Sequence, residues 1–101
     1  MQKSGKPLDG MRVAILATDD FEQAEMTEPR WALEQAGAQT VLISNKPGSV
    51  KGVHHDKPAD TFSVDLTLDQ ANPDDFDGVL LPGGASRIAS TRASITGSVW
   101  G

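Results

Sequence analysis

Three short, mainly apolar runs divide this chain, and each stops at a polar or glycine-containing turn. The runs cover residues 11–17, 39–44 and 78–81, without regular alternation between apolar and polar positions. An unbroken apolar run of this length is typical of a strand that is covered on both faces. The third run ends at Pro82, which has no N–H to donate to a neighbouring strand. The pattern therefore predicts a buried parallel sheet.

A helix is predicted between the first two runs. Its apolar side chains recur at helical spacing, at Met26, Pro29, Leu33 and Ala36. Gly37 supplies a left-handed stop, and Trp31 lies off the apolar stripe. Two starting points remain open: a start at Asp20 places Pro29 inside the helix and kinks it, whereas an N-cap at Thr27 places Pro29 in the first turn.

The order of strand, helix, strand, excursion and strand predicts an α/β fold. We expect a flavodoxin-like parallel sheet with flanking helices, truncated after about three main strands, with the first strand between the other two. Two extended pieces, residues 49–53 and 61–64, predict a small excursion or hairpin. Residues 67–70 have the form of a capping box and predict a short helix that ends at residues 71–73.

Length and charge limit the possible partners. The 101 residues allow one domain, which we divide into a flexible leader (1–10), a folded part (11–84) and a divergent tail (85–101) that is disordered or forms a short helix. Fourteen acidic residues against nine basic ones give a net charge of −5, which argues against nucleic acid or an anionic membrane as a partner. No apolar stretch approaches a membrane span, so we expect a cytoplasmic protein.

The chain contains no cysteine, which excludes disulfides and cysteine-ligated metal. His54, His55 and Asp56 carry side chains that can bind zinc. Adjacent histidines in an extended segment point to opposite sides, which disfavours a shared ion. We therefore expect neither a metal nor another cofactor.

The glycine pair after the third strand is the first candidate for a functional site. Ligands of open α/β sheets bind past the carboxyl ends of the strands, where Gly83 and Gly84 follow Pro82. The alternative is an ordinary turn, the commonest role of paired glycines. Glu25 is the second candidate, because it stands near a helix start beside the end of the first strand. The alternative for Glu25 is an exposed carboxylate that the helix dipole stabilises.

Several segments together resemble one family. They are residues 12–17 (RVAILA), 20–25 (DFEQAE), the Glu28-Pro29 helix and residues 76–84 (FDGVLLPGG). In combination they resemble the N-terminal half of the ThiJ/PfpI family, which is class I glutamine amidotransferase-like. This family includes intracellular peptidases, glyoxalase III-type enzymes and a protein deglycase, and the resemblance covers residues 11–84.

The resemblance implies a cysteine-dependent chemistry on a peptide or a small aldehyde, in a stress response. It implies that Glu25 is the pocket glutamate, with Glu22 a weaker neighbour, and that Gly83 and Gly84 form an oxyanion loop. The nucleophilic cysteine has no counterpart here, so we expect the chain to be inactive by itself. A non-catalytic binding or assembly module of the same fold is the alternative, and a homo-oligomer is a possible assembly.

Overall fold

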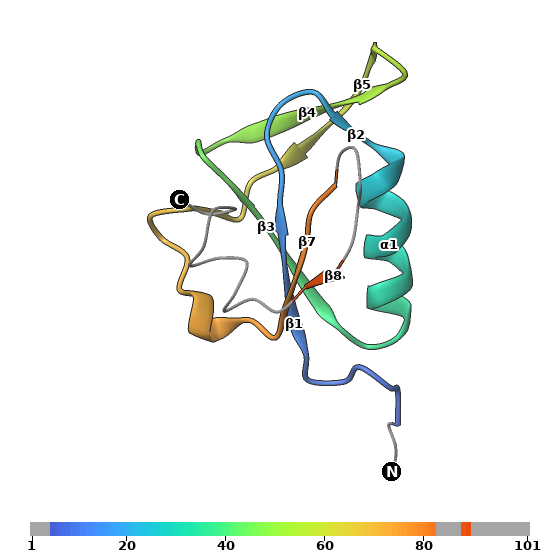
Figure 1. The fold of residues 1–101 in the computed structure, drawn as a ribbon, viewed down its shortest axis with the longest axis vertical. Coiled ribbons are helices and arrows are strands. Elements are labelled where there is room, and N and C mark those ends of the chain that lie inside the picture. Colours follow the sequence, from blue (N-terminus) through green and yellow to red (C-terminus); the bar gives the residue numbers. More distant parts are fainter. Residues whose placement is uncertain (1–4, 83–87, 90–101) are drawn as a thin grey trace.

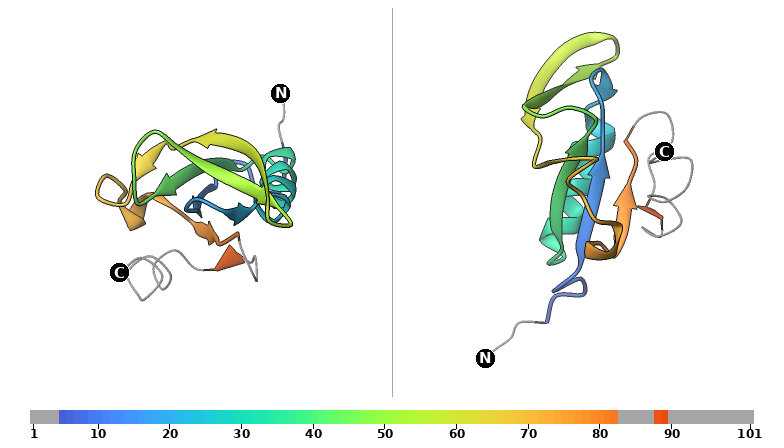
Figure 2. Two further views of the ribbon diagram at one scale, coloured as in Figure 1. Left: turned by 90° about the horizontal axis from the view of Figure 1, so that it is seen from above. Right: turned by 90° about the vertical axis from the view of Figure 1, so that its left-hand side faces the viewer.

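A computed structural model describes residues 5–82 and 88–89 of the chain. A five-stranded sheet with the order β6-β3-β1-β7-β8 forms the centre, with helix α1 beside it (Figure 1). A three-stranded sheet with the order β2-β4-β5 extends from the main sheet at one end (Figures 1 and 2). The α/β class with a parallel sheet is as predicted.

The three apolar runs form the middle of the main sheet. They are β1 (Arg12–Leu16), β3 (Gln39–Ser44) and β7 (Gly78–Leu80). β1 lies between the other two and pairs with both in parallel, so that Ile15 stands opposite Leu42 and Leu80. The predicted order of these strands is therefore confirmed.

Two short strands that the sequence did not predict widen this sheet. β6 (Leu66–Thr67) pairs in parallel with β3, and β8 (Ile88–Ala89) pairs antiparallel with β7. β8 falls within the segment that we expected to be disordered or helical. The remainder of that segment lies outside the described residues.

Helix α1 (Ala24–Gln35) begins at neither of the two expected positions. Its N-cap is Gln23, and Pro29 lies inside the helix, where it lacks the N–H for one helical hydrogen bond. The predicted stop is confirmed, because Gly37 has a φ of 105°. The N–H groups of Gly37 and Ala38 donate to the carbonyls of Glu34 and Leu33, which closes the helix end. In the described part of the chain, no helix has the length and apolar character that a bilayer crossing requires.

Two buried clusters hold the main sheet, and strand residues alternate between them because neighbouring side chains point to opposite faces. The cluster on the α1 side comprises Val13, Ile15, Ala17, Phe21, Met26, Ala38, Leu42, Val50 and Leu80. The other cluster comprises Ala14, Val41, Ile43, Phe76 and Val79. Both faces of the sheet are thus buried, as the unbroken apolar runs indicate.

The segment between β3 and β7, predicted as a small excursion or hairpin, contains a hairpin. β4 (Ser49–His54) and β5 (Lys57–Ser63) are antiparallel, and His55 and Asp56 form their turn with positive φ angles of 51° and 72°. The hairpin joins the rest of the chain through β2 (Phe21–Glu22), which pairs with β4 and was not predicted. The Phe21 ring also contacts the Phe62 ring, with centroids 5.7 Å apart.

The prediction of a short helix over residues 67–70 is wrong. Thr67 ends β6, and the next three residues form a hydrogen-bonded turn. One bond of the capping box does form, since the Thr67 N–H donates to Gln70 Oε1 at 2.9 Å. The helical turn comes later, as a 3₁₀ helix, η1 (Pro73–Asp75), that Asn72 caps by accepting from the Asp74 N–H. A local capping pattern was therefore overridden by pairing between β6 and β3.

Two aspartates at strand starts each hold a neighbouring strand by two bonds. The Leu42 N–H donates to Asp65 Oδ2, and the Leu42 carbonyl accepts from the Asp65 N–H, both at 2.8 Å. Asp77 makes the same pair of bonds with Arg12, at 2.9 and 2.8 Å. Hydrogen bonds to a charged acceptor are stronger than neutral ones. These aspartates therefore help to set the register of β6 and β7.

Candidate functional site

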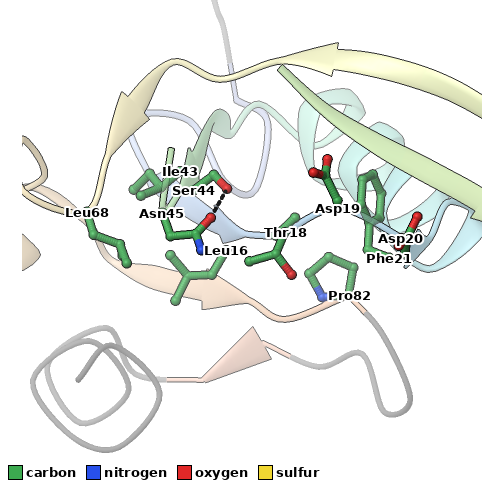
Figure 3. A pocket seen from close by; sticks show the side chains of 11 residues that line it. Leu16, Thr18, Asp19, Asp20, Phe21, Ile43, Ser44, Asn45, Leu68 and Pro82 are labelled. Carbon is green, nitrogen blue, oxygen red and sulfur yellow. Dashed lines mark hydrogen bonds between the residues drawn. The ribbon is translucent and has the colours of Figure 1, made fainter. Parts of the chain in front are cut away.

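A pocket of about 380 Å³ opens where the central strands end (Figure 3). It lies past the carboxyl ends of β1, β3 and β7, the edge at which open α/β sheets bind ligands. The described residues that line it are Leu16, Ala17, Thr18, Asp19, Asp20, Phe21, Ile43, Ser44, Asn45, Leu68 and Pro82. The ends of β1 and β3 and the segment after β7 thus contribute to one candidate site.

The lining divides into an apolar floor and a polar rim. We use "floor" for Leu16, Ile43 and Leu68, whose side chains lie along one side of the pocket in Figure 3. We use "rim" for the polar lining residues, which are Thr18, Asp19, Asp20, Ser44 and Asn45. Ser44 is only 2% exposed, and its hydroxyl donates to Asn45 Oδ1 at 3.2 Å. The pocket therefore combines apolar surface with a few placed polar groups, the usual composition of a small-molecule site.

Asp19 on the rim is held by two positive or donating partners. Its Oδ2 is 2.6 Å from Lys46 Nζ, and its Oδ1 accepts from the Lys51 N–H at 2.9 Å. The side-chain bond from Lys46, followed by the backbone bond from Lys51, lowers the pKa of Asp19 below its ordinary value of 3.8. Asp19 also borders a second, polar hollow of about 300 Å³, together with Asp20, Lys46, Ser49, Lys51 and Thr61.

Replacing Lys46 by methionine should raise the pKa of Asp19 toward its ordinary value, because the main cause of the lowered pKa is removed. A lowered carboxylate pKa stabilises the fold at pH values above the pKa in the unfolded chain. That contribution disappears as the pH falls through the pKa in the folded chain. An NMR titration of the aspartate carboxyl carbons measures the change. The control is Lys57→Met, which should leave Asp19 unchanged because Lys57 lies at the far end of the hairpin, at the start of β5.

The structure places the predicted site residues on different elements. Glu25 is the second residue of α1 and is half-buried. Glu22 lies in β2, where its Oε2 is 3.9 Å from His54 Nδ1 and accepts from the His55 N–H at 3.4 Å. Neither glutamate is among the described residues that line the pocket. Gly83 and Gly84, which follow Pro82 in the sequence, lie outside the described residues; Pro82 itself lines the pocket.

The expectation that His54 and His55 point to opposite sides is wrong. Their ring centroids are 4.6 Å apart, because His55 leaves the extended conformation and begins the hairpin turn. Proximity of two rings does not make a metal site. Within residues 5–82 and 88–89, no group of three or more His, Cys, Asp or Glu side chains is placed to hold a metal ion.

Most residues of the pocket lining were not predicted from the sequence. Thr18 and Asp19 directly follow β1, and Asn45 directly follows β3. The signal that identified the third strand end, polar or glycine residues after a buried run, is present at these two ends as well. Leu68 carried no such signal, because its place in the floor depends on how the segment after β6 crosses the sheet.

Comparison with known proteins supplies the family. The model of the DJ-1/PfpI family matches residues 11–96. The chain belongs to the DJ-1/PfpI family. The match extends beyond residue 84, where we expected the resemblance to end, and so includes part of the segment that we treated as a divergent tail.

Two curated relatives show how much of a DJ-1/PfpI protein is present. An uncharacterized protein from Staphylococcus saprophyticus is 46% identical over 76 residues, which are 74% of this chain and 42% of the relative. A deglycase from Pyrococcus abyssi is 40% identical over 74 residues, which are 73% of this chain and 42% of that enzyme. The chain thus spans about two fifths of the length of these relatives.

Solved structures agree on the fold. A DJ-1 superfamily protein from Agrobacterium tumefaciens aligns with a TM-score of 0.63 at 24% identity, over 73% of this chain and 38% of that chain. A two-domain protein from Anabaena variabilis, with DJ-1/ThiJ/PfpI-like and ferritin-like domains, aligns with a TM-score of 0.62 at 30% identity. That alignment covers 74% of this chain and 22% of the Anabaena protein.

Proposed function

We propose that this chain forms the substrate-receiving part of a DJ-1/PfpI site and does not catalyse cysteine-dependent chemistry by itself. The observation that carries the proposal is the absence of cysteine from all 101 residues. A thiolate is the attacking group of such chemistry, because it is nucleophilic near neutral pH. For a complete domain that contains this part, we propose hydrolysis of peptides or conversion of small aldehydes, including deglycation, in a stress response.

Among the described residues, the buried hydroxyl group at the pocket is not paired with a base. Thr18 and Ser44 border the pocket, but a serine or threonine nucleophile needs a base within hydrogen-bond reach. Ser44 donates to the Asn45 amide, which is not a base. The two histidines of the chain lie at the tip of the hairpin and are not among the described residues of the pocket lining. This arrangement supports inactivity of the chain by itself.

A second candidate function is a non-catalytic binding or assembly module. The pocket favours this candidate, since its size and its apolar floor suit a small ligand whether or not a reaction follows. Self-association of the chain is an assembly of this kind. Binding assays and turnover assays separate the two candidates, because a module binds without turnover.

The purified 101-residue chain should neither consume methylglyoxal nor cleave fluorogenic peptides above the rate without protein. The deglycase from Pyrococcus abyssi, assayed in parallel, provides the positive control for the aldehyde reaction. The physical reason is the missing thiolate, since the chain contains no cysteine.

Turnover that follows the protein through purification, and that Thr18→Ala or Ser44→Ala abolishes, would contradict the proposal. Such a result would identify an oxygen nucleophile at the pocket. Turnover that is lost after a second, independent purification comes from a contaminating enzyme. Turnover that survives both substitutions and the second purification also contradicts the proposal.

A further inference from the structure

The pocket contains an amide whose orientation is set by a buried hydroxyl. Ser44 is 2% exposed, and it donates to Asn45 Oδ1 at 3.2 Å. Because this bond holds the amide oxygen, the Asn45 Nδ2 group faces the other way, toward Leu16 (Figure 3). Within the described part of the chain, these Nδ2 donors have no hydrogen-bond partner. A pair of donors is thus presented to the pocket.

The surface below these donors is apolar. Leu16 comes from the end of β1, Ile43 from β3 and Leu68 from the turn after β6. Ile43 is fully buried, so the apolar surface that remains for a ligand to cover is that of Leu16 and Leu68, which are half-buried. An aliphatic group of a ligand that covers this floor would leave water, which favours binding in proportion to the apolar area removed.

The charge around the pocket disfavours anions. Asp19 and Asp20 both line it, and Lys46 offsets one of them through its ion pair with Asp19. Asp19 and Asp20 of the lining, together with the Lys46 that pairs with Asp19 from outside it, carry about one negative charge at neutral pH. A ligand carboxylate placed beside them would be repelled, whereas an uncharged oxygen would not.

We propose that this pocket is a binding site for an uncharged aliphatic molecule that carries one hydrogen-bond-accepting oxygen. The oxygen accepts from Asn45 Nδ2, and the aliphatic part lies on Leu16 and Leu68. A volume of about 380 Å³ suits a ligand of this kind. The site does not depend on the inactivity proposed above, since it requires no covalent step.

Two matched probes test the site by NMR with a methyl-labelled chain. 4-Methylpentanamide and 4-methylpentanoate share one aliphatic body and differ in the charge of the polar end. At neutral pH the amide should shift the methyl signals of the floor residues in a saturable manner. The carboxylate should bind at least about fivefold more weakly, because it is charged and cannot replace the neutral acceptor without repulsion.

Two single substitutions, one just after the carboxyl end of β3 and one at its start, test the role of Asn45 and provide its control. Asn45→Ala should weaken amide binding about fivefold or more, the typical effect of one lost hydrogen bond. Gln39→Ala, at the opposite end of β3, should leave binding unchanged. Unchanged methyl signals in the α1-side cluster verify that each variant is folded.

Three results would overturn the proposal: no saturable shift at the floor, equal binding of the two probes, or equal binding by Asn45→Ala and the unmodified chain. None of these results bears on turnover. Failure of this site is therefore distinguishable from failure of the proposed inactivity, which the enzyme assays test.

Discussion

Met26→Ala lowers the free energy of unfolding by about 2–5 kcal/mol, the usual cost of truncating a fully buried methionine. Met26 is 0% exposed and is the α1 residue within the cluster on that side of the main sheet. Its removal leaves a cavity between α1 and the strands, which the surrounding side chains fill only in part. Urea unfolding followed by circular dichroism measures the change.

The control for this substitution lies on the same helix. Trp31 is a larger residue, but it is 66% exposed, so Trp31→Ala should change the free energy of unfolding by less than about 0.5 kcal/mol. Equal losses in the two variants would mean that α1 does not pack as described. The comparison tests the position of the helix independently of its length or helix propensity.

Gly37→Ala should cost about 2–3 kcal/mol of unfolding free energy, for two reasons that add. Gly37 has a φ of 105°, a conformation that residues with a side chain rarely adopt. A Cβ at this position would also meet the Asp9 side chain, the Asp9 backbone nitrogen at 3.0 Å and Lys6 Cβ at 3.0 Å. The segment before β1 would have to move away from the end of α1.

Gly48→Ala separates the two reasons. Gly48 has a similar φ of 93°, but a Cβ there meets nothing within 4 Å. Its substitution should cost about 1 kcal/mol, from the backbone conformation alone. If chemical denaturation gave the same loss for both variants, crowding by Asp9 would be excluded as a cause.

Patterns over a few residues predicted the elements well but their boundaries less well. The unbroken apolar runs identified β1, β3 and β7, and Gly37 identified the end of α1. The start of α1 was missed because Gln23, its N-cap, makes no side-chain capping bond. Without that bond the sequence lacks the Ser, Thr, Asp or Asn signal by which helix starts are usually found.

The candidate site was predicted in position more than in composition. Ligand binding past the carboxyl ends of the strands is a rule of strand polarity, and the pocket lies there. Its lining comes from segments that are far apart in the chain, such as Thr18, Asn45 and Leu68. Which of these residues meet depends on the register between strands, and register is not a local property.

The amino-acid sequence by itself determined the buried strands, the helix between the first two of them, its glycine stop and the lack of a cysteine nucleophile, because each depends on nearby residues or on composition. Only the tertiary structure decided that β2 joins the hairpin, that the capping pattern at Thr67 yields to strand pairing, and that Asp65 holds Leu42. These contacts connect residues some twenty or more positions apart. The free energy that selects them comes from burying whole faces of the sheet together, which no short window of sequence contains.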